Sequence, residues 1–173
     1  MSHKEQRVYC LNLKDKYPEY FNCTTVLDVG SRDVNGNNRH LFYRPRYTGI
    51  DIVAGKNVDI IGHIHSFHPY REYDVIICTE MLEHDRYFYA SLDRMIDLLV
   101  SNGLLIITAA GIGREPHGIT GSNPKDSPAT LDYYMNVTQE NLKMSLHQMK
   151  DFSMWQLEQD EQLKDIYFYG IKH

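Results

Sequence analysis

The sequence lacks long apolar runs, an N-terminal signal region and a cysteine framework. Its longest apolar runs are only a few residues, so no segment is expected to cross a bilayer and no membrane partner is predicted. The first seven residues, MSHKEQR, are polar and do not predict secretion. Three cysteines without metal-like spacing, Cys10, Cys23 and Cys78, favour reduced thiols and a cytoplasmic protein.

An excess of positive charge is also missing. Eighteen Lys and Arg residues face 23 Asp and Glu residues, a formal net charge of −5, and there is no long basic run. Proteins that grip a nucleic-acid backbone over many phosphates are usually more basic. The charge therefore argues against extensive nucleic-acid binding and leaves a single nucleotide open. At 173 residues, the chain predicts one domain spanning residues 1–173.

Short apolar runs and amphipathic stretches alternate along the chain. The runs are rich in Val and Ile and read as strands buried on both faces, which are typically parallel. They cover residues 25–30, 47–53, 58–61, 73–78 and 103–108. Helices are predicted over residues 4–20, where Pro18 disturbs the last turn, from Asp85 as a cap to Leu99, and after Thr138.

Two strand-like segments close the chain, at residues 153–159 and 166–172. Because only a short charged link joins them, we expect them to pair as antiparallel neighbours. The sum is an α/β fold with a doubly wound, mostly parallel sheet of seven strands that is antiparallel near the C-terminus.

The strongest motif is VLDVGSRDVNG at residues 26–36. An apolar strand ends at Asp28, and a glycine-bearing turn follows before an expected helix. Gly30 has no side chain, so the backbone can pass close to a ligand. Asp28 at the strand end can hold an ammonium group, directly or through water.

A second carboxylate, Asp51, follows Gly30 by twenty-one residues at the end of the next strand. A carboxylate there accepts hydrogen bonds from both hydroxyls of a ribose. Two acids at successive strand ends are what a nucleoside carrying an amino-acid tail requires. The third motif, YDVIICTEMLEH at residues 73–84, runs from a buried strand into polar residues at the same edge. There Glu80 is either a solvated acid or a substrate contact, and Glu83 and His84 are either helix caps or active-site residues.

In their order and spacing, these motifs resemble the class I (Rossmann-like) S-adenosylmethionine-dependent methyltransferases, especially the small type-11-like domains. The resemblance covers roughly residues 24 to 172 and implies the Rossmann-like methyltransferase fold. It also implies S-adenosylmethionine as cofactor and S-adenosylhomocysteine as product. The first motif would surround the methionine part of the cofactor. Asp51 would bind the ribose, and Ile52 would lie beside the adenine. The cofactor-binding residues that it implies are Asp28, Gly30, Ser31, Gly36, Asp51, Ile52, His63, Ile64, Cys78 and Thr79.

The chain departs from the family pattern at two places. Arg32 stands where a second glycine is usual, so we expect a longer loop to Gly36 with a compensating contact from Ser31. His63 stands where an acid usually bonds the adenine amino group, and a neutral imidazole could accept that bond.

His63, His65 and His68 form an H-x-H-x-x-H pattern that also suits a metal. No acid or cysteine accompanies them at a familiar spacing, and the segment falls where adenine should lie. We therefore expect no metal site.

Residues 109–134 are long, rich in Gly and Pro, and without periodicity. Such a segment is either a substrate lid or a plain connection, and the lid is favoured because it leaves the ligand-binding edge. Arg114 would suit a phosphate or carboxylate of the acceptor, and Tyr133 would line its pocket. His117, like His84, is a candidate general base.

The sequence thus predicts methyl transfer to a small-molecule or nucleotide- or sugar-like acceptor, and Arg114 would suit an anionic one. A non-catalytic S-adenosylmethionine-binding subunit is the alternative. A nicotinamide-dependent oxidoreductase is disfavoured because G-x-G-x-x-G is missing. The acceptor and the oligomeric state stay open.

Overall fold

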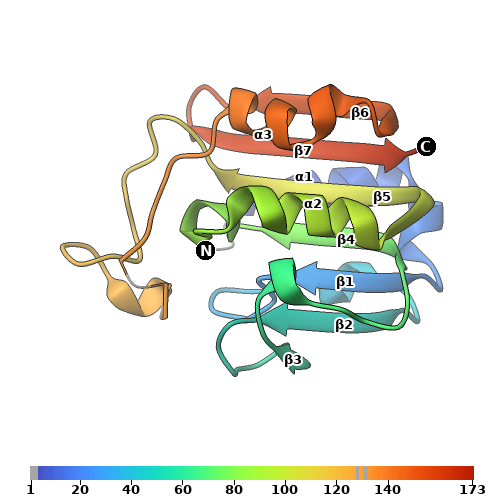
Figure 1. Cartoon of the computed structure of the whole chain (residues 1–173), viewed down its shortest axis with the longest axis horizontal. Helices are drawn as coiled ribbons and strands as arrows, with labels where there is room; N and C mark the ends of the chain where they lie inside the picture. Colours follow the sequence, from blue (N-terminus) through green and yellow to red (C-terminus); the bar gives the residue numbers. More distant parts are fainter. Residues whose placement is uncertain (1–3, 128, 131) are drawn as a thin grey trace.

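A computed structural model describes residues 4–127, 129–130 and 132–173. Its core is a seven-stranded sheet of order β3-β2-β1-β4-β5-β7-β6 (Figure 1). Strands β1 to β5 pair in parallel, and β7 runs antiparallel to both β5 and β6. The predicted doubly wound, mostly parallel sheet with an antiparallel end is confirmed. The strands are β1 Thr25–Val29, β2 Arg46–Asp51, β3 Ile60–Ile61, β4 Tyr73–Thr79, β5 Leu99–Ala110, β6 Phe152–Gln159 and β7 Asp165–Lys172.

Both faces of the central strands are buried, which explains why their sequences are continuously apolar. Successive side chains point to opposite faces of a sheet, and helices cover both faces here. On β4, Ile76 and Cys78 join one buried cluster, whereas Val75 and Ile77 join the other. Because neither face meets water, no position in the middle of β4 is polar.

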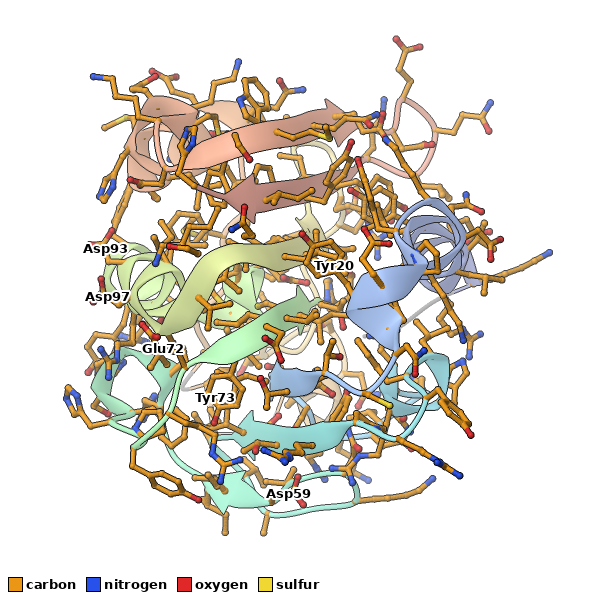
Figure 2. All side chains as sticks on the ribbon, turned by 90° about the vertical axis from the view of Figure 1, so that its right-hand side faces the viewer. Tyr20, Asp59, Glu72, Tyr73, Asp93 and Asp97 are labelled. Atoms are coloured by element: carbon orange, nitrogen blue, oxygen red, sulfur yellow. The ribbon has the colours of Figure 1, made fainter. Side chains whose placement is uncertain are left out.

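The helices divide between the two faces. Figure 2 shows the sheet edge-on, with α1 on one side and α2 and α3 on the other. Helix α1 (Lys4–Lys16) packs through Cys10 and Leu13, and α2 (Phe88–Leu98) packs through Leu92 and Met95. Helix α3 (Gln139–Ser145) begins at a capping box, in which Thr138 and Asn141 exchange side-chain and backbone hydrogen bonds.

Helix α1 is shorter than predicted. It ends at Lys16, and the chain continues as the 3₁₀ turn η1 (Pro18–Phe21). Pro18 has no N–H to donate to an α-helix and its ring clashes with the preceding turn. The proline therefore ends the α-helix rather than disturbing it.

The helix expected after Gly30 does not form. Residues 31–45 are all described, and the only helical element among them is the 3₁₀ turn η2 (Arg39–Leu41). The Asp33 carboxylate accepts from the Gly36 backbone N–H (2.8 Å) and from the Asn37 amide (2.8 Å). These local bonds compete with helical ones and fold the segment into an irregular loop.

Asp85 does not cap α2. Tyr87 occupies the cap position and makes no side-chain capping bond. Asp85 Oδ1 instead accepts from the Tyr87 backbone N–H at 2.8 Å, which closes the turn ahead of the helix. Within the described part of the chain, no helix has the length and apolar character needed to span a membrane.

We expect Leu105→Ala to lower the free energy of unfolding by about 2–5 kcal/mol, the usual cost of a cavity left by a buried leucine. Leu105 lies on β5 between β4 and β7 and is fully buried. Urea denaturation followed by circular dichroism measures the loss. The matched control is Leu11→Ala on α1, whose side chain is 45% exposed. It should change stability by no more than about 0.5 kcal/mol. Equal losses for the two variants would contradict the assigned core.

Candidate functional site

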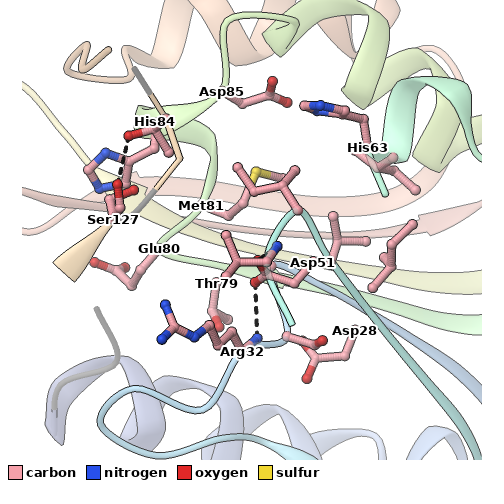
Figure 3. A pocket seen from close by; sticks show the side chains of 18 of the residues that line it. Asp28, Arg32, Asp51, His63, Thr79, Glu80, Met81, His84, Asp85 and Ser127 are labelled. Carbon is pink, nitrogen blue, oxygen red and sulfur yellow. Dashed lines mark hydrogen bonds between the residues drawn. The ribbon is translucent and has the colours of Figure 1, made fainter. Parts of the chain in front are cut away.

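A cavity of about 300 Å³ opens at the carboxyl ends of β1, β2 and β4 (Figure 3). Its volume is at the lower end of the range for small-molecule sites. Every residue that the sequence implied for cofactor binding, apart from Cys78, lines it. These residues are Asp28, Gly30, Ser31, Gly36, Asp51, Ile52, His63, Ile64 and Thr79. Because three parallel strands end here, residues distant in sequence share one site.

The turn after β1 requires glycine at position 30. Gly30 has φ +75°, and a Cβ there would lie 2.6 Å from Met81 Cβ in the loop after β4. The backbone N–H groups of Gly30 and Ser31 both donate to the Ile50 carbonyl, at 2.9 and 3.1 Å. The turn is therefore held between β2 and the β4 loop.

Arg32 fills the position of the missing second glycine without disturbing this turn. Its backbone N–H donates to Asp51 Oδ2 at 3.1 Å. Its side chain lies against the backbone of Gly55, where a Cβ would come within 3.0 Å of Arg32 Cγ. A side chain is accommodated at position 32 because it extends away from the turn.

Asp28 is buried at the end of β1. Its Oδ2 accepts from Tyr47 Oη (2.7 Å) and from the Asn57 amide (3.0 Å). Burial raises the pKa of Asp28 to about 6, although both hydrogen bonds oppose the rise. A cationic group beside this carboxylate would favour its ionised form.

Asp51 at the end of β2 is oriented by the backbone. Oδ2 accepts from Arg32 N–H and Oδ1 from Val53 N–H (3.0 Å). Each oxygen thus has one fixed donor and keeps a lone pair for another. Such a carboxylate can accept from two adjacent hydroxyls.

An aromatic wall completes this end of the cavity. The rings of His63 and His65 lie 5.1 Å apart, and those of His65 and Tyr87 lie 4.0 Å apart. The sequence predicted His63 here, but it did not indicate His65 and Tyr87 as its ring partners. His68 does not join them, since its Nδ1 lies 3.1 Å from Arg94. The three histidines therefore do not converge as the H-x-H-x-x-H pattern suggested.

Four predicted site residues, Cys78, Arg114, His117 and Tyr133, are not among the described residues that line the cavity. Strand alternation directs the Cys78 side chain into the core, where burial raises the pKa of its thiol. Arg114 is drawn to the buried carboxylate of Asp165 on β7, at 2.5 Å. The Tyr133 ring lies under the Arg86 guanidinium, and its hydroxyl contacts Met135 Sδ at 3.0 Å.

Glu80 is not a solvated acid. It is 7% exposed, lines the cavity and has φ +55°. Its backbone N–H donates to the Thr108 carbonyl, and its Oε1 accepts from the Thr108 hydroxyl, both at 2.9 Å. β5 therefore holds Glu80 in this strained conformation.

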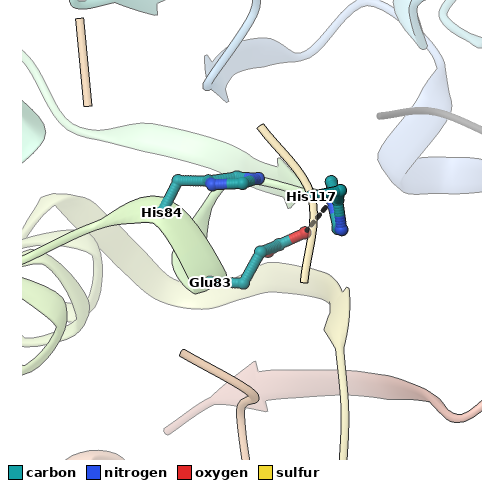
Figure 4. Close-up of side chains that lie close together, drawn as sticks. All are labelled: Glu83, His84 and His117. Atoms are coloured by element: carbon teal, nitrogen blue, oxygen red, sulfur yellow. Dashed lines mark ion pairs between the residues drawn. The ribbon is translucent and has the colours of Figure 1, made fainter. Parts of the chain in front are cut away.

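The two predicted bases come together although 33 residues separate them. The rings of His84 and His117 lie 5.0 Å apart, and Tyr134 contacts both. Glu83, which neither caps α2 nor meets solvent, lies 3.9 Å from His117 Nε2 (Figure 4). The sequence left Glu83 open between cap and site, and it gave no signal that Glu83 faces His117.

Burial sets the protonation states in this cluster. It lowers the pKa of His84 to about 4, although an interaction with the Tyr133 backbone opposes the shift, and it also lowers the pKa of His117. Burial raises the pKa of Glu83, while the backbone N–H groups of Glu83 and Ala110 oppose the rise. Both imidazoles are thus neutral at pH 7.

The segment 109–134 lies beyond the carboxyl ends of the strands (Figure 1), and residues 128 and 131 of it are outside the described residues. Strand β5 extends to Ala110, so the loop itself begins at Gly111. Its base is closed by the Asn136 amide, which donates to the carbonyls of Gly111 (2.7 Å) and Arg114 (3.1 Å). Its residues Ser127, Ala129 and Thr130 line the cavity.

No protein-family profile matches the sequence, and no curated protein matches it significantly. Solved structures do match. The Burkholderia thailandensis 1,6-didemethyltoxoflavin-N1-methyltransferase, with its substrate and S-adenosylhomocysteine bound, is 16% identical with a TM-score of 0.66, over 96% of this chain and 77% of its own.

Two further structures agree. The N-methyltransferase NodS from Bradyrhizobium japonicum WM9, in complex with S-adenosylhomocysteine, is 12% identical with a TM-score of 0.63, over 97% of this chain and 87% of its own. The N-terminal domain of EvdMO1, in the presence of S-adenosylhomocysteine and D-fucose, is 14% identical with a TM-score of 0.66, over 100% of this chain and 85% of its own. At these identities the likeness establishes the fold, and the chain has the fold of the class I, Rossmann-like methyltransferases.

Proposed function

We propose that this protein is an S-adenosylmethionine-dependent methyltransferase that acts on a small-molecule acceptor. The observation that carries the proposal is the pair of strand-end carboxylates, Asp28 and Asp51, in one cavity beside the Gly30 turn. Solved structures of the same fold contain S-adenosylhomocysteine, which supports the same cofactor here.

In this proposal the cofactor follows the strand ends. Asp28 pairs with the ammonium group, and the turn from Gly30 to Gly36 passes along the methionine part. Asp51 accepts from the ribose hydroxyls through the lone pairs that its backbone donors leave. Ile52, Ile64 and the ring of His63 contact the adenine. The methyl-bearing sulfur then lies near Thr79, at the end of β4.

Methyl transfer to an acceptor is an in-line displacement at the sulfonium methyl. Since sulfur is a good leaving group, alignment supplies much of the rate enhancement. His84 lines the cavity and is neutral at pH 7, so it can take a proton from an oxygen or ring-nitrogen acceptor. We propose the segment 109–134 as the lid, with His117 behind His84. For an anionic acceptor, Arg86 replaces Arg114 as the cation at the cavity.

The oxidoreductase alternative loses further support. Dinucleotide-binding folds place a pyrophosphate at the N-terminus of the helix that follows the first glycine turn. Residues 31–45, all of them described, contain only a 3₁₀ turn at Arg39–Leu41. A non-catalytic cofactor-binding subunit would bind S-adenosylmethionine and methylate nothing.

We expect S-adenosylmethionine and S-adenosylhomocysteine to bind far more tightly than NAD. The reason is the paired carboxylates combined with a turn that has neither glycine fingerprint nor helix. Isothermal titration calorimetry compares the three ligands under identical conditions. A preference for NAD would overturn the proposed function.

Asp51→Ala should weaken S-adenosylhomocysteine binding about ten- to a hundredfold. Losing hydrogen bonds to a charged group costs roughly 1.5–3 kcal/mol. The dissociation constant is measured by calorimetry, with the melting temperature as a check on folding. Asp97→Ala is the control, because this side chain is 68% exposed on the outer face of α2. An unchanged affinity in folded Asp51→Ala protein would refute the ribose assignment.

Cofactor affinity should rise as the pH increases from 5 to 7. The pKa of Asp28 is about 6 without ligand, so below pH 6 a proton must leave before the carboxylate can pair with the ammonium group. The ammonium stays charged across this range, since its pKa is about 7.7–8.0. The dissociation constant should therefore grow by up to about tenfold per pH unit below 6.

The control for this pH dependence is Asp28→Asn. It should bind the cofactor more weakly than the wild type and show a nearly flat profile from pH 5 to 7. The free protein should show the opposite trend in stability. Because the Asp28 pKa is raised above its unfolded value, its contribution to stability is lost as the pH rises through about 6. A pH profile that persists in Asp28→Asn would assign the titration to another group.

A further inference from the structure

The cluster of Glu83, His84 and His117 brings a carboxylate and two imidazoles together in a largely buried place. His117 Nδ1 lies 3.2 Å from the Glu115 carbonyl oxygen. A carbonyl oxygen can only accept, so Nδ1 carries the hydrogen and Nε2 presents a lone pair. That lone pair faces Glu83 Oε1 at 3.9 Å. An imidazole lone pair and a carboxylate oxygen repel each other unless a proton or a metal ion lies between them, and 3.9 Å is too long for a hydrogen bond.

His84 contributes a third acceptor. Its Nδ1 is buried and has no hydrogen-bonding partner among the residues that the structure describes. The Tyr133 backbone also interacts with this ring. One ligand atom from each of His84, His117 and Glu83 lies within 4.8 Å of the other two.

Glu83 is the group most in need of a partner. It is 0% exposed, and neither carboxylate oxygen makes a hydrogen bond with the described chain. The backbone N–H groups of Glu83 and Ala110 interact with it without reaching hydrogen-bonding geometry. The nearby Arg114 guanidinium is already bound to Asp165. Buried charged groups without partners are rare because losing hydration is costly.

We propose that Glu83, His84 and His117 form a binding site for one divalent transition-metal ion of the Zn²⁺ type. Two imidazoles and one carboxylate are a donor set of zinc and related ions, whereas Mg²⁺ and Ca²⁺ prefer oxygen ligands alone. The hydrogen bond of the His117 ring to the Glu115 carbonyl is the kind of outer-shell contact that fixes a metal-binding histidine.

The ligand atoms must close in slightly when the ion binds. Tetrahedral zinc with bonds near 2.1 Å needs ligand atoms roughly 3.4 Å apart. His117 can supply this movement, because it lies on the loop that follows β5 and is not part of a helix or strand. Glu83 stays fixed, since its carbonyl accepts from the Met135 backbone N–H at 2.8 Å.

His84 also lines the cavity, so a fourth position on the ion can face it. An acceptor with a hydroxyl oxygen could occupy that position, where the ion would lower the pKa of the hydroxyl and would replace the His84 imidazole as the group that activates the acceptor. This role rests on the proposed methyltransferase function, whereas the metal site itself does not.

The test uses full-length protein stripped with a chelator, without cofactor or acceptor. Co²⁺ serves as a spectroscopic probe, and Zn²⁺ is added afterwards in competition. We expect one equivalent of Co²⁺ to produce visible absorption bands of low coordination number and Zn²⁺ to abolish them. His117→Ala and Glu83→Gln should each weaken Co²⁺ binding at least tenfold.

Two histidine variants serve as controls. His40→Ala removes an exposed histidine, and His147→Ala removes a surface imidazole that pairs with Asp93 and Asp151. Both should bind Co²⁺ as the wild type does. If Glu83→Gln fails to fold by circular dichroism, His117→Ala decides the result.

Absence of a stoichiometric cobalt spectrum in the wild type would overturn the proposal, as would binding that is lost in His147→Ala but kept in His117→Ala. Because S-adenosylhomocysteine binding is titrated separately, failure of the metal site leaves the proposed function untouched. Conversely, a protein that binds cobalt but has no affinity for the cofactor would support the metal site and refute the proposed function.

Discussion

The parallel pairing of β1 with β2 and β4 is the constraint on which the rest of the structure depends. In that register Val29 lies opposite both Ile50 and Cys78, so the three chains emerge at one edge of the sheet. Asp28, Asp51 and Thr79 consequently share one cavity, although 51 residues separate the first from the last. Any change of register by one residue would turn these side chains to the other face.

The Gly30 turn makes this edge tight enough to be specific. Gly30 leaves room for Met81, and its neighbour Ser31 packs against Gly49, where a Cβ would meet Ser31 Oγ at 2.7 Å. The first contact joins the β1 turn to the loop after β4, and the second joins it to β2. Because Gly30 has no side chain, a ligand bound there can approach the backbone closely. The loop from Asp33 to Gly36 is held by its own hydrogen bond and not by a helix.

Buried polar groups are concentrated at the same edge of the sheet, although burying them costs hydration free energy. Four such residues are at most 9% exposed: Asp28, Glu80, Glu83 and His84. Burial raises the pKa of Asp28 and of Glu83 and lowers the pKa of His84. Their hydration is lost, whereas most side chains deeper in the sheet are apolar. Perturbed ionisation beside a cavity is typical of functional sites.

The sequence by itself determined the strands, the mixed sheet and the position of Asp28, Gly30 and Asp51 at strand ends that line the cavity, because these follow from local periodicity and from short turns. Tertiary structure alone decided the rest. Local Asp33 bonds replaced the helix after Gly30, and Asp165, distant in sequence, drew Arg114 away from the cavity. The meeting of Glu83 and His84 with His117 depends on how the loop after β5 folds back. No local pattern encodes such a contact, because its energy comes from groups that only the folded chain brings together.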